Sequence, residues 1–215
     1  MAADGMLLGL GTGSTVHFAL IRLAERIRDE RLRVRGVPTS LDTEEKAREL
    51  GIPLVELADA QRIDLTIDGA DEIDARFDMI KGGGGALLRE KVVASITTTE
   101  VVVVGADKVV ERLGRRFLLP VEVVPFARPM VVRALGELGA QPTVRLGEQG
   151  KPFITDNQNE ILDCRFPGGI EDAPELERRL KTIPGIVESG LFIGLADVLV
   201  IGHPNGEAEV RNRPR

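Results

Sequence analysis

The chain of 215 residues carries 34 acidic and 28 basic side chains, which gives a formal net charge of -6 at pH 7. An acidic chain is not typical of a general nucleic-acid binder, because such proteins hold phosphates with many lysines and arginines, so we expect no nucleic-acid partner. Hydrophobic residues make up 43% of the sequence and charged residues 29%, the balance of a globular protein with a sizeable core.

The N-terminus and the cysteine content bear on the compartment. The opening residues MAADGMLLGLG carry an acidic side chain where a secretory signal would be basic, and their apolar stretch is short. No segment approaches the about 20 apolar residues that span a membrane, so we expect no membrane partner. Cys164 is the only cysteine, which leaves no disulfide within the chain. We therefore expect a cytoplasmic protein.

The first half of the sequence alternates between short apolar runs and amphipathic segments. Runs of Val, Ile and Leu predict strands, and apolar residues at helical spacing predict helices. In chain order we expect a strand at 6–10, a helix at 16–30, a strand at 34–38, a helix at 43–51, a strand at 63–68, a helix at 86–96 and a strand at 101–107. This alternation predicts an α/β fold with an open, doubly wound, Rossmann-like sheet of parallel strands.

From about Leu119 the order of elements changes. The pattern predicts a strand at 120–125, a helix at 127–139, two strands at 151–155 and 160–164 joined by the turn DNQN, a helix at 175–183 and a strand at 185–192. This β-α-β-β-α-β order is the split arrangement of ferredoxin-like modules. We expect a second, smaller ferredoxin-like α+β domain at 119–190 and a Rossmann-like catalytic domain formed by 1–118 and 191–215. The run at 196–202 is expected to rejoin the first sheet, and the polar tail after it to fray.

A glycine-rich loop, GLGTGST at 9–15, follows the first expected strand. Its amides stand at the start of a helix, where the helix dipole favours an anion, and Ser14 and Thr15 add hydroxyl donors. The loop departs from the dinucleotide fingerprint because Ser14 replaces the third glycine, and it lacks the Gly-Lys-Ser/Thr of a P-loop. A phosphate group is the expected guest. The alternative for this motif alone is a glycine-rich turn that binds nothing.

An acidic loop, DGADEID at 68–74, follows the third expected strand. Carboxylates placed there bind metal, accept hydrogen bonds from sugar hydroxyls or shuttle protons. An EF-hand is excluded, because Ala70 stands at its third position and Met79 at its twelfth. A solvated acidic turn is the alternative for this loop alone.

Four consecutive glycines at 82–85 follow Lys81 and precede an expected helix. Such a run weakens any packed element that contains it, so something must require bare backbone at this point. Glycine amides can approach an anion closely, and Lys81 supplies positive charge for a developing oxyanion. Glu90 lies between Arg89 and Lys91 on the helix that follows, and its spacing alone is typical of a solvated surface residue.

Four motifs together resemble the ribose-5-phosphate isomerases of the A type in their order and spacing. They are GLGTGST, DGADEID, KGGGGALLREK and GADK with Lys108. The resemblance extends through PVEVVPFA, TDNQNEILDCRF, IPGIVESGLF and the final strand, and it covers nearly the whole chain. Four motifs in register are far more specific than any one of them.

The resemblance implies an enzyme of the pentose phosphate pathway that interconverts ribose 5-phosphate and ribulose 5-phosphate. It implies a homodimer or homotetramer that needs neither metal nor organic cofactor. It also implies a helix of some fifteen residues before the first strand, which the printed sequence does not contain.

The resemblance also implies a role for each motif. Thr12, Gly13, Ser14 and Thr15 would bind the phosphate with Lys108 nearby, Asp68, Gly69, Ala70 and Asp71 would line the sugar end, and Lys81, Gly82, Gly83 and Gly84 would bind the reacting oxygens. Glu90 would accept the proton from carbon. Lys81 would stabilise the enediolate, and Asp68 or Asp71 would pass the hydroxyl proton between the two oxygens.

Two further functions stay open at this point. A sugar-phosphate sensor module would bind a similar ligand without turnover, and such regulators carry a DNA-reading helix-turn-helix that is not evident before the first strand. An aminosugar-phosphate deaminase needs a ring-opening histidine arrangement. That arrangement is not evident in a chain whose only histidines are His17 and His203.

Overall fold

The computed structural model describes residues 1–214, and the chain divides into two compact units. The large-sheet unit contains Met1–Gly69, Arg89–Ala106 and Leu195–Arg215, and the small-module unit contains Ala70–Leu88 and Asp107–Gly194. The domain boundaries expected from the sequence stay a prediction. In the structure, residues 70–88 and 107–118 group with the segment 119–190.

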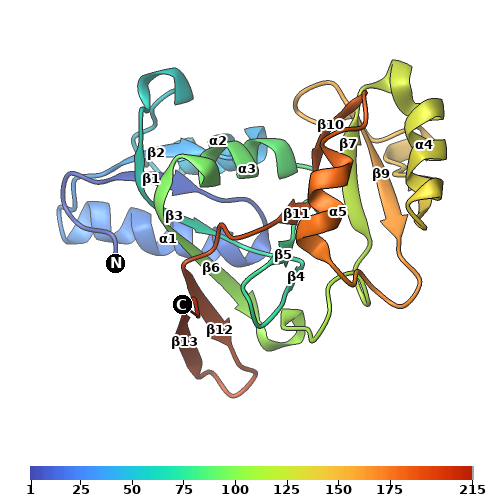
Figure 1. Cartoon of the computed structure of the whole chain (residues 1–215). Coiled ribbons are helices and arrows are strands. Elements are labelled where there is room, and N and C mark those ends of the chain that lie inside the picture. The colour runs from blue at the N-terminus through green and yellow to red at the C-terminus, as the bar shows by residue number, and fades with distance from the viewer. Residues whose placement is uncertain (215) are drawn as a thin grey trace. The chain divides into compact units, whose positions relative to one another are not determined.

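The large-sheet unit is built on a six-stranded sheet in the order β13-β12-β6-β3-β1-β2. Its strands are β1 (Leu7–Leu10), β2 (Arg35–Pro38), β3 (Ile63–Asp68), β6 (Thr97–Gly105), β12 (Val198–Gly202) and β13 (Ala208–Asn212). All neighbours pair in parallel except β12 and β13. Helix α1 (Ser14–Asp29) lies on one face, and α2 (Leu41–Glu49) and α3 (Leu87–Ser95) lie on the other (Figure 1). The predicted doubly wound α/β fold is confirmed.

Apolar side chains of the central strands and of α1 form the main core of this unit. Leu8 and Leu10 of β1 point to one side, because they are two residues apart, and they share a buried cluster with Leu20 of α1. Each fully buried leucine contributes about 1.5 to 3 kcal/mol relative to an exposed one. On the opposite side, a Cβ at Gly9 would lie 2.8 Å from Val93 of α3, so only glycine allows this helix to pack so closely.

The strand order creates a switch point between β1 and β3. The chain runs from β1 outward to the edge strand β2 and then returns past β1 to β3. In open α/β sheets the ligand crevice lies beyond the carboxyl ends of the strands at such a point, because the two connections leave in opposite directions. The loops that begin at Gly11 and Gly69 therefore occupy the expected ligand-binding end of the sheet.

The small-module unit contains a four-stranded antiparallel sheet in the order β10-β7-β9-β8. Its elements are β7 (Leu119–Val123), α4 (Arg128–Glu137), β8 (Gln141–Val144), β9 (Glu160–Arg165), α5 (Ala173–Leu180) and β10 (Ile186–Ser189). Val121 and Leu162 pair across β7 and β9, and they share one buried cluster with Leu135 of α4 and Leu180 of α5. The β-α-β-β-α-β order is the one that the sequence predicts.

The strand predicted at 151–155 is wrong. The partner of β9 is β8, and the segment 151–155 makes only isolated bridges, Leu146 to Pro152 and Ile154 to Glu160. Pro152 has no backbone N–H to give to a ladder, which disfavours a regular strand at this position. The sequence of β8, QPTV, has a weak strand pattern because it lies at a sheet edge with alternate residues exposed.

Two other expectations near the C-terminus are also corrected. The segment expected as one strand at 185–192 divides at Gly190 into β10 and β11 (Leu191–Phe192), and β11 joins a separate sheet with β5 (Met79–Ile80) and β4 (Glu72–Ile73). A Cβ at Gly190 would lie 2.4 Å from the Lys81 carbonyl oxygen, so the close approach of these two backbone segments requires glycine at position 190. The tail does not fray as a whole, since β13 pairs with β12 through five residue pairs.

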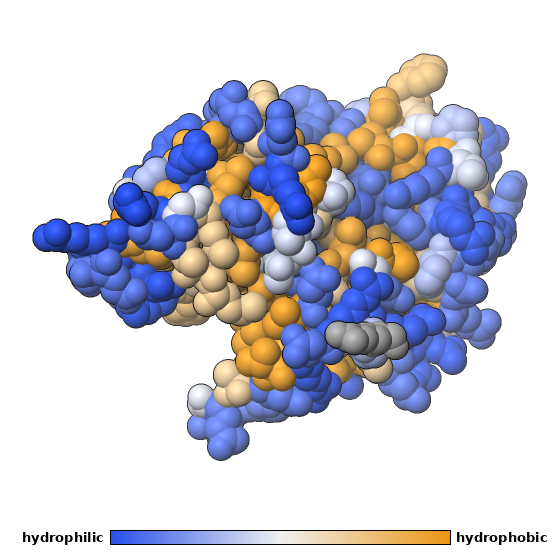
Figure 2. All heavy atoms as spheres, turned by 60° about the vertical axis from the view of Figure 1, so that its left-hand side comes forward, coloured by the Kyte–Doolittle hydropathy of each residue, from blue (hydrophilic) through white to orange (hydrophobic). Residues whose placement is uncertain are grey.

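Polar side chains cover most of the face that Figure 2 shows, with hydrophobic residues in smaller patches between them. Among the described residues, no helix is both long and apolar enough to cross a membrane.

Candidate active site

In the large-sheet unit, the loop after β1 presents the amino end of α1. Gly13 precedes the helix with a φ of 112°, a conformation that favours glycine, and its carbonyl accepts the first helical hydrogen bond from His17 N–H at 3.1 Å. The backbone N–H groups of the first turn have no hydrogen-bond acceptor within the helix. Gly13, Ser14 and Thr15 are exposed, and the first turn carries no acidic residue. This end of α1 is suited to bind an anion such as phosphate.

Thr12 holds this loop in place from within. Its hydroxyl donates to Ser40 Oγ at 2.8 Å, and Ser40 in turn donates to Thr43 Oγ1 at 3.0 Å. Thr43 Oγ1 closes the chain by donating to the Gly11 carbonyl at 2.9 Å. Because these hydroxyl bonds connect the loop to the start of α2, the side chain of Thr12 positions the loop, while the exposed residues that follow face solvent.

Asp68 at the end of β3 connects the two neighbouring loops. Its Oδ1 accepts hydrogen bonds from Thr12 N–H at 3.1 Å and from Gly69 N–H at 2.7 Å. A Cβ at Gly11 would lie 2.3 Å from this same oxygen, so the close approach of the loops needs glycine there. Asp68 therefore holds the loops after β1 and β3 together, in addition to being a predicted site residue.

In the small-module unit, side chains pack closely against three glycines of the run 82–85. A Cβ at Gly82 would lie 2.9 Å from Leu87, one at Gly83 would lie 3.0 Å from Phe117, and one at Gly85 would lie 2.5 Å from Phe153. Gly82 and Gly85 also adopt φ values of 109° and 83°. Close packing with left-handed backbone explains Gly82 and Gly85, and close packing explains Gly83, while Gly83 and Gly84 are exposed.

Asp71 fixes the direction of one of these glycine amides. Its Oδ2 accepts a hydrogen bond from Gly83 N–H at 2.7 Å. Burial raises the pKa of this carboxyl, and the Gly83 bond and the positive charges of Lys81, Lys108 and Arg145 act in the opposite direction. A carboxyl with a raised pKa is better able to hold and release a proton near neutral pH.

Lys81 is only 3% exposed, which is rare for a lysine. Its Nζ lies 5.4 Å from the centre of the Phe192 ring, and its backbone N–H donates to the Gly190 carbonyl at 2.9 Å. Lys108 differs from it, because its side chain is 40% exposed and lies 4.0 Å from Asp107. Lys81 directly precedes the glycine run and is buried with its ammonium near Phe192, while Lys108 keeps access to solvent.

Glu90 is buried in the first turn of α3, with 5% of its surface exposed. The reading of this residue as a solvated surface carboxylate, which its position between two basic residues favoured, is wrong. Ionisable residues are rarely buried so deeply, and among the described helices Glu90 shares this burial with Glu177 of α5, which pairs with Lys181 and Ser189.

Two residues of the small-module unit were missed by the sequence analysis. Arg145 donates from Nη1 to the carbonyl oxygens of Gly82 and Gly83, at 2.8 and 3.1 Å. Glu72 accepts three backbone N–H bonds, from Gly114, Arg116 and Phe117, at 2.6 to 2.8 Å. No motif marked Arg145. Glu72 lies in the acidic loop DGADEID directly after Asp71, and this position was the available signal.

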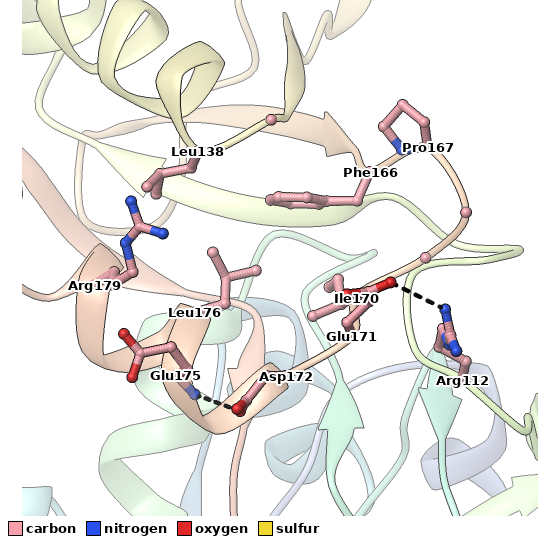
Figure 3. Close-up of a pocket in the computed structure, with 13 residues that line it drawn as sticks. Arg112, Leu138, Phe166, Pro167, Ile170, Glu171, Asp172, Glu175, Leu176 and Arg179 are labelled. Atoms are coloured by element: carbon pink, nitrogen blue, oxygen red, sulfur yellow. Dashed lines mark hydrogen bonds and ion pairs between the residues drawn. The ribbon is translucent and has the colours of Figure 1, made fainter.

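The small-module unit also contains a separate cavity of about 400 Å³ (Figure 3). Leu138, Phe166 and Leu176 line its apolar part, and Arg112 and Glu171 form an ion pair at its edge (Figure 3). None of the predicted site residues lines this cavity, so it is distinct from the glycine run. Within residues 1–214, no group of three or more His, Cys, Asp or Glu side chains is placed to hold a metal ion.

Comparison with known proteins gives consistent matches. Residues 35–206 match the family model described as ribose 5-phosphate isomerase A (phosphoriboisomerase A). A ribose-5-phosphate isomerase A from Roseiflexus castenholzii is 52% identical over 208 residues, which cover 96% of this chain and 88% of that protein. The solved ribose 5-phosphate isomerase A from Methanocaldococcus jannaschii is 42% identical, with a TM-score of 0.93 over 99% of this chain and 93% of its own. A D-ribose-5-phosphate isomerase solved in complex with phospho-erythronic acid is 37% identical, with a TM-score of 0.94 over 98% and 92%.

Proposed function

The chain belongs to the ribose 5-phosphate isomerase A family, and we propose that it interconverts ribose 5-phosphate and ribulose 5-phosphate by proton transfer through an enediolate. The observation that carries this proposal is the buried Lys81 directly before a glycine run in which Asp71 holds the Gly83 amide. A cation and oriented amides stabilise the negative charge that an enediolate develops on oxygen.

The reaction moves a carbonyl group between C1 and C2 of the open-chain sugar. Glu90 takes the proton from C2, the electron pair of that bond forms the C1–C2 double bond, and negative charge collects on O1. The same carboxyl then returns the proton to C1 while the carbonyl forms at C2. A positioned acid-base group of this kind contributes about 10² to 10⁴ in rate.

Stabilisation of the enediolate supplies the larger part of the catalysis. Lys81 provides the positive charge and the exposed amide of Gly84 provides a hydrogen-bond donor, while the Gly83 amide is held by Asp71. Asp71 is the better candidate for moving the proton between O2 and O1, because its pKa is raised by burial. Asp68 lines the sugar end and holds the neighbouring loop.

The phosphate group binds away from the reacting carbons. The exposed N-terminal turn of α1, with Gly13, Ser14 and Thr15, offers amides, hydroxyls and the favourable end of the helix dipole. Lys108 adds a solvent-accessible positive charge. Binding energy from this remote group fixes the sugar in register for proton transfer.

A coupled assay of ribulose 5-phosphate formation tests the activity directly. We expect turnover of ribose 5-phosphate that is unchanged by EDTA, and incorporation of deuterium at C1 of the product when the reaction runs in D₂O. Retention of the substrate hydrogen together with loss of activity in EDTA would favour a metal-assisted hydride shift. Binding of the sugar phosphate without turnover would favour a sensor.

We also propose that the enzyme works in the cytoplasm, in the pentose phosphate pathway, as a homodimer or homotetramer. The lone cysteine, Cys164, is buried, which suits a reducing compartment. Light scattering coupled to gel filtration measures the assembly, and a monomer at micromolar concentration would contradict it.

A further inference from the structure

We propose that Arg145, held by Asp163, is a positioning residue for the isomerisation, because it fixes two peptide planes of the glycine run and so sets the direction of the Gly84 amide that binds the enediolate. The inference rests on the proposed function and adds a residue outside the four motifs that carry the family resemblance. Arg145 follows β8 directly, and its own N–H continues the pairing with β9 by donating to the Ile161 carbonyl at 2.8 Å.

The guanidinium of Arg145 is engaged on both sides. Its Nε donates to Asp163 Oδ2 at 2.9 Å, and its Nη2 donates to the other carboxylate oxygen of Asp163. The remaining Nη1 donates to Gly82 and Gly83 carbonyls. The side chains of Arg145 and Asp163 are only 14% and 18% exposed. A bidentate pair in such a site is rigid, so the direction of Nη1 is fixed by Asp163.

Peptide geometry converts these carbonyl contacts into amide orientation. In a trans peptide the C=O and the next N–H point in opposite directions. The Gly82 carbonyl faces Arg145 and the Gly83 N–H faces Asp71, which are the two ends of one peptide plane. In the next plane the Gly83 carbonyl also faces Arg145, so the Gly84 N–H points away from the guanidinium.

Glycine makes this control necessary. Gly83 and Gly84 carry no Cβ, so their backbone can rotate through conformations closed to other residues. An amide that is free to rotate binds a developing oxyanion poorly, because catalysis by charge stabilisation depends on donors that are already oriented. The two carbonyl bonds from Arg145 restrict that rotation from the side opposite Asp71.

Phe153 belongs to the same arrangement. Its backbone N–H donates to the Arg145 carbonyl at 2.9 Å, and its ring centre lies 6.0 Å from the guanidinium carbon. The same ring fills the space beside Gly85. Arg145 therefore restrains 82–85 by two routes, through hydrogen bonds at the start of the run and through packing at its end.

Kinetics of Arg145 variants test the proposal, once wild-type turnover of ribose 5-phosphate has established the activity. For Arg145→Met we expect kcat to fall at least about 100-fold while KM changes less than about threefold, since the phosphate contacts stay intact. Arg145→Lys keeps the charge but cannot bond to Asp163 and to both glycine carbonyls at once, so we expect a loss of kcat of the same order. Arg133→Met, on the exposed side of α4, is the matched control and should keep wild-type kcat.

Two further measurements separate positioning from general destabilisation. Asp163→Asn leaves the arginine in place but loosens it, and should lower kcat less than Arg145→Met, with non-additive effects in the double variant. Millimolar guanidinium should restore part of the kcat of Arg145→Ala and leave Arg133→Ala unchanged. Folded Arg145→Met or Arg145→Lys enzyme with kcat within threefold of wild type would overturn the proposal. A loss of kcat that accompanies a lowered unfolding midpoint, and that guanidinium does not relieve, would overturn it as well. Absence of wild-type turnover would instead count against the proposed function.

Discussion

The Asp71 carboxylate accepts a hydrogen bond of 2.7 Å from the Gly83 amide, so an acid of the acidic loop and a donor of the glycine run are directly connected. The short strands β4 and β5 lie between Asp71 and Gly83 and pair with each other, which brings these two residues together. The proposed proton shuttle and the glycine run are thus neighbours in one compact unit.

The first prediction concerns pH and the stability of the folded chain. Burial raises the pKa of Asp71 above its ordinary value of 3.8, so the folded state binds this proton more tightly than the unfolded state. The free energy of unfolding should therefore fall, relative to that of Asp71→Asn, as the pH rises from about 3.8 through the raised pKa. Urea unfolding of both proteins between pH 4 and 7 measures the difference. If the unfolding free energy of the wild type relative to Asp71→Asn stays constant or grows with pH, burial does not destabilise the ionised form of Asp71.

The second prediction concerns the space beside Gly83. A methyl group there would lie 2.7 Å from Asp71 Oδ1 and 3.0 Å from Phe117, and both are ends of side chains that can move. Gly83→Ala should therefore cost about 1 to 3 kcal/mol at most in stability, while displacing Asp71 and lowering kcat more than tenfold.

Gly136→Ala is the control for this variant, because nothing lies within 4 Å of its Cβ position on α4. It should keep wild-type kcat and gain up to about 1 kcal/mol, since alanine favours the helix. Equal kcat values for the two variants would remove the role of the Gly83 region.

The third prediction separates phosphate binding from the stability of α1. Ser14→Asp places a negative charge in the first turn of α1, which contains no acidic residue. Because the helix dipole favours negative charge there, the variant should stabilise the helix by about 0.3 to 1 kcal/mol. The same charge should repel the substrate phosphate and raise KM at least about tenfold, equivalent to roughly 1.4 kcal/mol. Ser14→Asn is the neutral comparison. An unchanged KM in a stabilised Ser14→Asp enzyme would place the phosphate elsewhere.

The fold could be predicted from the sequence where patterns are strong and local. Apolar runs identified β1 and β6, because strands covered on both faces need them, and alternating apolar residues identified β3. Edge strands gave no such signal: β8 has a polar, alternating sequence, and β13 lies in a polar tail, so both were missed. Their pairing depends on neighbours that are distant in the sequence.

The candidate site divides in the same way. Glycine runs and acids in register identified Asp71, Lys81 and 82–85, because bare backbone and clustered charge have local sequence signatures. Burial does not. The basic neighbours of Glu90 favoured a solvated side chain and the family resemblance implied a proton acceptor, and tertiary packing buries it. The contacts of Arg145 with 82–83 join residues more than sixty positions apart, which no local pattern can reveal.

The turnover number of Glu90→Gln tests the central claim most directly. Glutamine keeps the size and burial of the side chain but cannot accept the carbon-bound proton. The exposed Glu49→Gln on α2 serves as control. We predict that kcat falls by about 10² to 10⁴ in Glu90→Gln and stays at the wild-type value in Glu49→Gln, with both variants folded. A folded Glu90→Gln enzyme with near wild-type kcat would contradict the account.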